Sequence, residues 1–195
     1  MSNLTGTLVA VAVGLSFAGA VSGTPFRYKV TSVATGTLGA TSFTDAAVTV
    51  TTLADTLDVT ISGSAPFTFW QVVGPTTISV SGIGTATFSV NDYGAVSGSF
   101  FGFGLIADLT ETQAVLGIVG NPNLAGFNLQ SPIGPVTGAA IFNQETFLTS
   151  MGNLNITGTG SLATFQAAAV PEPAQGMAFT GVLLLGAALY RRTRR

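Results

Sequence analysis

The feature that most constrains the fold is an alternation of apolar and polar residues with a period of two. It runs through residues 26–31, 48–51, 57–62, 78–81 and 86–90, where Val, Ile, Leu and Phe alternate with Thr, Ser, Asp and Lys. Successive side chains of a β-strand point to opposite faces, so this pattern predicts strands with one buried and one wet face. Thr, Val, Ile and Phe also favour the pleated surface.

Glycine and proline interrupt this pattern at short intervals, as in the pairs Gly74-Pro75, Asn121-Pro122 and Gly134-Pro135. Many short strands separated by turn residues are typical of an antiparallel β-sandwich or jelly roll. We therefore expect a mainly β chain with a single such domain over residues 24–169. The only plausible helical stretches are short, around residues 108–116 and 143–150.

Charge is scarce and unevenly placed. Charged residues make up 7% of the chain, against about 25% in an average soluble protein. Arg27 and Lys29 are the only basic residues before a terminal cluster, while the eight acids are scattered singly. Nucleic acid is excluded as a partner, because binding a polyanion requires clustered Lys and Arg. Cysteine and histidine are absent, which excludes disulfides, thiol chemistry and the usual general base.

The N-terminal residues 1–23 read as a signal peptide. An apolar stretch over residues 8–17 is followed by small residues that suit cleavage after Ala20 or Gly23. The segment is too short and too rich in glycine for a confident membrane-spanning helix. The alternative is a buried first strand of the domain.

The C-terminal residues 170–195 have three parts in a fixed order. Val170, Pro171, Glu172 and Pro173 form a stiff non-helical spacer, because each proline removes an amide donor and disfavours helix. Residues 174–190 carry no charge, and as a helix they would span about 25 Å, slightly less than a bilayer core. The arginines that follow would stop transfer and stay cytoplasmic, and they are Arg191, Arg192, Arg194 and Arg195.

This arrangement resembles the PEP-CTERM sorting signal of Gram-negative bacteria. The resemblance implies that residues 170–173 are the recognition motif of an exosortase-type membrane enzyme, and that the arginine cluster retains the precursor. It further implies export by the general secretion machinery, transient anchoring in the inner membrane and delivery to the cell surface or extracellular matrix of a biofilm. The alternative is an ordinary single-pass anchor behind a proline linker.

Few residues suggest chemistry. A serine nucleophile would depend on Lys29, the only lysine, which we expect on the wet face of a strand. Asp55 and Asp58 are close enough in sequence to suggest a carboxylate pair, but both suit a turn. With Asn91 and Asp92 they could offer oxygen ligands to calcium, although no calcium-loop pattern is present. We therefore assign no catalytic, metal or cofactor-binding residue and expect a protein that is not an enzyme.

Aromatic residues gather in two stretches, residues 67–70 and 100–103. Phe67 and Phe69 share one face of a strand, so Trp70 must lie on the other. Filling the core is the ordinary role of such phenylalanines. Trp70, the only tryptophan, is our candidate ligand contact if the domain binds sugar.

These observations lead to one expectation for the domain and two alternatives. We expect a non-catalytic structural or adhesive β-domain displayed at the cell surface or in the extracellular matrix, with exopolysaccharide as a candidate partner. The first alternative is a surface module that binds glycans or calcium. The second is an unusual hydrolase built on two carboxylates.

Overall fold

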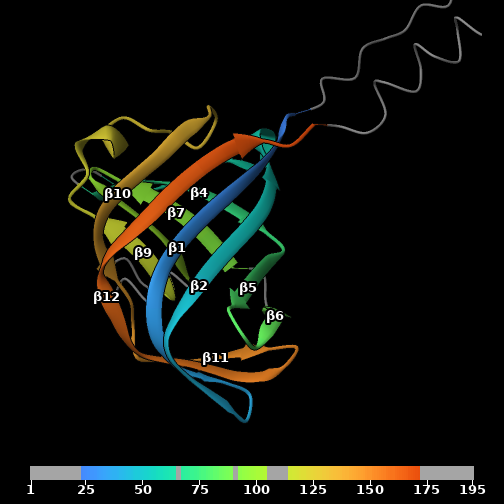
Figure 1. Ribbon diagram of the computed structural model, residues 1–195. Coiled ribbons are helices and arrows are strands. Elements are labelled where there is room, and N and C mark those ends of the chain that lie inside the picture. The colour runs from blue at the N-terminus through green and yellow to red at the C-terminus, as the bar shows by residue number, and fades with distance from the viewer. Residues whose placement is uncertain (1–22, 65–66, 90–91, 105–113, 172–195) are drawn as a thin grey trace, which may run out of the picture.

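A computed structural model describes residues 23–64, 67–89, 92–104 and 114–171, and these residues form a β domain with two short 3-10 helices (Figure 1). The predicted membrane helix and almost all of the predicted signal peptide lie outside the described residues. The elements are β1 (Pro25–Leu38), β2 (Thr41–Asp55), η1 (Thr56–Asp58), β3 (Thr60–Ser64), β4 (Phe67–Gly74), β5 (Thr76–Val80), β6 (Gly84–Thr87), β7 (Asp92–Ser97), β8 (Phe100–Gly104), β9 (Leu116–Val119), η2 (Pro122–Leu124), β10 (Ile133–Ile141), β11 (Thr146–Thr149) and β12 (Gly152–Ala169).

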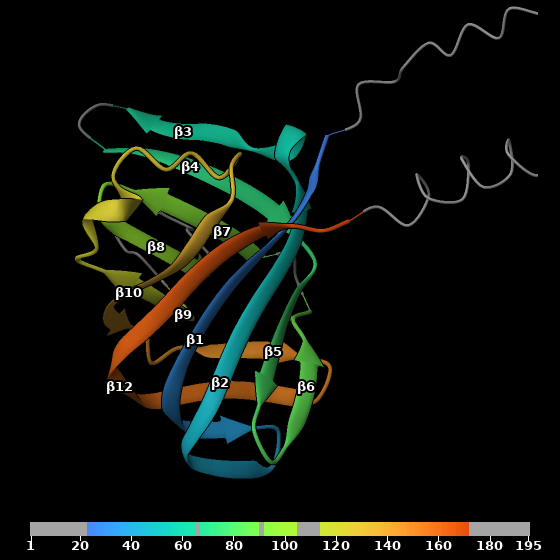
Figure 2. The same ribbon diagram turned by 45° about the horizontal axis from the view of Figure 1, so that its top comes forward.

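All the strands belong to one hydrogen-bonded sheet with antiparallel pairing throughout. The strand order is β3-β4-β7-β8-β9-β10-β12-β1-β2-β5-β6, and β11 pairs with β12. The sheet curls over, so that β10, β12, β1 and β2 form one layer and β4, β7 and β8 lie behind it (Figures 1 and 2). The predicted mainly antiparallel β fold is confirmed. Its two facing layers are parts of one continuous sheet, not two separate sheets.

The core lies between these layers and is filled by large apolar side chains. Phe101 of β8 stacks on Phe165 of β12, with ring centroids 3.8 Å apart. Phe103 meets the Phe101 ring edge-on at 5.0 Å, and both phenylalanines are fully buried. The stack of Phe101 on Phe165 joins the two layers and helps to hold the curled sheet closed.

Tyr28 of β1 is also fully buried, and its hydroxyl reaches across the core. The hydroxyl donates a hydrogen bond of 2.5 Å to the carbonyl oxygen of Leu129, in the loop before β10. Leu129 itself has a left-handed backbone, with φ of 63°. Burial, and secondarily the negative charge of Asp55, raises the pKa of the Tyr28 hydroxyl above its usual value.

Three local predictions are corrected. Residues 143–150 do not form a helix, because Thr146–Thr149 is strand β11. This strand pairs with β12, and its side chains are alternately exposed and buried. The strand predicted over residues 57–62 begins only at Thr60, because residues 56–58 form the helix η1. Asp55 caps this helix, and its carboxylate accepts a hydrogen bond from the Leu57 amide at 2.8 Å. Gly134 and Pro135 form no turn, and lie instead at a bulge inside β10, where the register with β12 shifts. Residues 108–113 of the other predicted helix lie outside the described residues, and Leu116 begins β9.

The first and last strands of the domain pair with each other along most of their length. Phe26 lies opposite Ala169, and the amide of Val170 donates to the carbonyl oxygen of Pro25 at 2.8 Å. The start of β1 and the end of β12 therefore meet at the same end of the molecule (Figure 1). Pro171 follows at once and is exposed.

Candidate functional site

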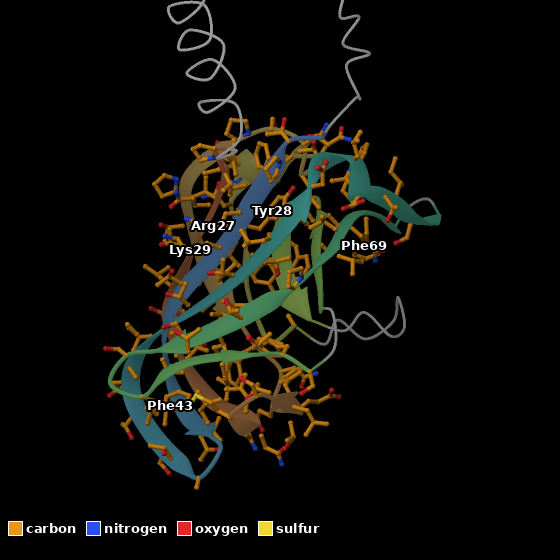
Figure 3. The ribbon with its side chains drawn as sticks, turned by 90° about the vertical axis from the view of Figure 1, so that its right-hand side faces the viewer. Arg27, Tyr28, Lys29, Phe43 and Phe69 are labelled. Carbon is orange, nitrogen blue, oxygen red and sulfur yellow. The ribbon has the colours of Figure 1, made fainter. Side chains whose placement is uncertain are left out.

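The two basic residues of the described chain lie together on the outside of β1. Arg27 is exposed and Lys29 half-buried, while Tyr28 between them points into the core (Figure 3). Residues two apart on a strand share a face and lie about 6.7 Å from each other along it. Within the described residues, neither side chain makes an ion pair or a hydrogen bond. Both charges therefore have no partner in the part of the chain that the structure describes.

Hydroxyl side chains line up beside these two residues on the same face. We call the outward-facing side of β10, β12, β1, β2, β5 and β6 the outer face. Strand register places six hydroxyl residues directly opposite one another across it, in one unbroken row. This hydroxyl row consists of Thr137, Thr164, Thr31, Thr49, Ser79 and Thr85.

Neighbouring members of the hydroxyl row are hydrogen-bonded in pairs. The Oγ1 atoms of Thr31 and Thr49 are 3.2 Å apart, and so are those of Thr137 and Thr164. Thr85 donates to the Oγ of Ser79 at 3.1 Å. Because threonine is stiff at χ1, these bonds hold the hydroxyls in defined positions. With strands about 4.8 Å apart, the row extends for about 24 Å.

A second row runs parallel to the first, one step of the pleat away. In it Lys29 lies between Gln166 of β12 and Thr51 of β2, and the row continues through Thr77 to Thr87. Arg27 belongs to the next step, between Ala168 and Leu53. The outer face thus joins two cations to a regular array of hydroxyl and amide groups.

Acidic groups are absent from both rows. Among the described residues, the nearest acid in register is Asp55 at the end of β2, opposite Pro25. Its carboxylate is already occupied by the amide of Leu57. The two rows and the step beside them therefore carry two described positive charges, on Lys29 and Arg27, in a chain whose net charge is −2.

The residues singled out from the sequence are dispersed rather than gathered into one site. Trp70 lies on β4, partly buried and packed against the core, far in strand order from Lys29. Asp55 and Asp58 belong to the cap and body of η1, as expected for turn residues. Lys29 lies on the outer face as predicted, and its neighbours in register are Thr51 and Gln166 rather than a serine.

The residues considered above as possible calcium ligands are only partly described. Asn91 lies outside the described residues, and Asp92 begins β7. Within the described ranges, no group of three or more acidic side chains comes together in a way that could hold a metal ion.

Of the predicted sorting motif, Val170 and Pro171 are described and directly follow β12. Glu172 and Pro173 lie beyond the described residues, as do Arg191, Arg192, Arg194 and Arg195. In the part of the chain that the structure describes, no helix is both long and apolar enough to cross a membrane.

Comparison of the chain with models of protein families, with curated proteins and with solved structures gives no match. The outer face therefore has to be interpreted from its own geometry. Sequence reasoning placed Lys29 on a wet strand face but missed the rows. The threonines at alternate positions signalled them, yet only the strand register shows that they align.

Proposed function

We propose that this chain is an exported protein of the cell surface or extracellular matrix, whose β-domain has a structural or adhesive role and no catalytic one. A C-terminal PEP-CTERM signal would hold the precursor in the inner membrane with its C-terminus in the cytoplasm. An exosortase-type enzyme would then process it. The general secretion machinery and this enzyme are its processing partners, and exopolysaccharide is the candidate partner of the mature domain.

The observation that carries this proposal is how the domain ends. The hydrogen bond from the Val170 amide to the Pro25 carbonyl closes the last strand, and Pro171 follows without a linker. A proline cannot donate to the sheet, so the ladder ends at Val170, the first residue of the motif. The motif therefore stands at the border of a folded unit, where cutting would release that unit whole.

The non-catalytic part of the proposal rests on the residues that are available. The chain has no histidine or cysteine, and its single lysine has no serine opposite it in register. Asp55, the acid best placed for a carboxylate pair, is engaged as a helix cap. What the fold offers instead is a broad polar face, which suits binding or packing.

The sorting signal is tested in the native host by the triple substitution P171A, E172A and P173A. The parent should appear outside the inner membrane in a shortened form, whereas the variant should stay full-length in the inner membrane. The matched control, P132A with E145A, alters the same residue types outside the tail and should be processed like the parent. If the triple variant is shortened and released as usual, the tail is only an anchor.

Mass spectrometry of the mature C-terminus refines this test. Cleavage within or just after residues 170–173 would support processing at the motif. An intact C-terminus ending at Arg195 in the surface fraction would contradict it.

A further inference from the structure

We infer that the outer face binds a linear anionic polysaccharide. In this arrangement Arg27 and Lys29 pair with acidic groups of the polymer, and the hydroxyl row bonds its sugar hydroxyls. The inference names a partner class for the proposed structural or adhesive role and takes its biological setting from that proposal. The binding itself is a property of the folded domain and does not depend on export.

The charge pattern selects an anionic ligand. Arg27 and Lys29 share one side of β1, with no acid in their own rows and no partner within the described residues. Two basic side chains whose Cα atoms lie about 6.7 Å apart along a strand can reach two acidic groups spaced along a polymer. They are too few for nucleic acid, whose binding requires many phosphate contacts.

The hydroxyl row selects a sugar polymer among anionic ligands. A hydroxyl both donates and accepts, and a bonded pair such as Thr31 and Thr49 still has one O–H and unused lone pairs to offer. Sugar hydroxyls have the same dual character, so the two arrays complement each other. The mutual bonds already hold the row in place, which lowers the entropy lost on binding.

The shape of the face selects an extended ligand. The row crosses six neighbouring strands, which is longer than a monosaccharide and suits a chain lying across them. Contacts are spread over many weak groups, so one site should bind weakly. Many copies of the protein on one polymer would bind firmly through avidity.

The test measures binding of the full chain, in nonionic detergent, to alginate as an acidic polysaccharide. Every protein in this test, the parent included, also carries R191Q, R192Q, R194Q and R195Q, so that the tail contributes no cation. Dextran of similar length serves as the neutral sugar polymer and polyglutamate as the acidic polymer without sugar hydroxyls. We expect measurable, salt-sensitive binding to alginate that exceeds binding to either of the others.

The cation arm compares R27Q/K29Q with a variant of restored charge. Loss of two charge contacts at the surface should weaken alginate binding by about 2- to 30-fold. Adding I61K and L148K to that double variant returns the net charge of the protein to that of the parent. The new charges lie on β3 and β11, at side chains that are 57% and 64% exposed. This variant should bind as weakly as R27Q/K29Q. If it binds like the parent, only net charge matters and the inference is wrong.

The hydroxyl arm uses T31V/T49V, which keeps shape and charge but removes one hydrogen-bonded pair. Alginate binding should weaken by about 2- to 10-fold, while T146V on β11 should have no effect. Unchanged binding in T31V/T49V would overturn recognition of the sugar. Absence of alginate binding by the parent, or equal binding to polyglutamate or dextran, would also overturn the inference. Neither result would bear on sorting, which the tail variants test separately.

Discussion

At the residue scale, Tyr28 combines a buried ring with a single polar bond. Its hydroxyl bonds the carbonyl of Leu129, and replacing it by hydrogen leaves that carbonyl without this partner. We expect Y28F to lower the free energy of unfolding by about 1–3 kcal/mol. Urea unfolding measures this loss, with T146V as the control at an exposed hydroxyl of β11, where the change should stay within about 0.5 kcal/mol. Equal losses in the two variants would contradict a special role for the Tyr28 bond.

The same hydroxyl predicts how stability depends on alkali. Its pKa is raised above 10.0 in the folded protein by burial, so above about pH 10 the unfolded chain releases a proton that the folded chain retains. This contribution to stability is complete below pH 10 and is lost as the pH rises further, by up to about 1.4 kcal/mol per pH unit.

Unfolding midpoints in urea between pH 8 and 11.5 check this dependence. The parent should lose stability more steeply than Y28F above pH 10, because the variant lacks the titrating group. Parallel curves for the two proteins would show that Tyr28 ionises as readily in the folded state as in the unfolded one.

At the scale of strands, the contact between β1 and β12 depends on a glycine at a register shift. A Cβ on Gly36 would lie 2.1 Å from the carbonyl oxygen of Asn155, which is backbone and cannot move aside. G36A should therefore destabilise the domain by about 1–3 kcal/mol, in the range of overpacked cores. Thermal or urea unfolding measures it.

The matched control is G158A, on β12 in the same ladder. A Cβ at Gly158 meets nothing within 4 Å, so alanine there should be neutral or stabilise by up to about 1 kcal/mol. If G158A is as harmful as G36A, the close approach between backbones is not the cause.

Strands were predictable from sequence where the alternation was long and regular. Residues 26–31 and 48–51 lie in β1 and β2 because one face packs the core and the other meets water. β11 was missed because its polarity does not follow its burial: the apolar Leu148 is exposed and the polar Thr149 is buried. The pairing of Phe26 with Ala169 was invisible, since a local pattern contains no information about a distant partner.

The candidate site could be predicted only in part, because it too depends on which distant strands pair. Alternation alone placed Lys29 on a wet face, but the alignment of Thr31 with Thr49 and Thr164 depends on the register of three strands. A slip of one residue would turn each of these side chains to the other face. Trp70 was the candidate ligand contact because it is the only tryptophan, yet its side chain is partly buried and packs against the core.

At the scale of the whole molecule, β12 joins β10 on one side to β1 and β2 on the other, within the layer that these four strands form. The C-terminal half of β12 pairs with β1 on one side and with β10 on the other. Phe165, for example, lies opposite both Val30 and Val136. A chain ended after residue 158 would leave one edge of β10 and much of one edge of β1 unpaired. It would also remove Phe165 from its stack on Phe101 and expose the aromatic core there. We expect this shortened chain not to fold, as judged by rapid proteolysis and loss of near-ultraviolet dichroism.

Ending the chain after Pro171 should have the opposite result. The ladder is complete at the bond between Val170 and Pro25, so this form should keep the unfolding midpoint of the full chain within about 2 °C. Thermal unfolding of the two forms in the same nonionic detergent measures the difference. A marked drop would mean that the domain needs residues beyond 171, and that cutting at the sorting motif could not release a stable unit. An unchanged midpoint is what the proposed processing requires, because the enzyme would then cut a tether and leave the sheet intact.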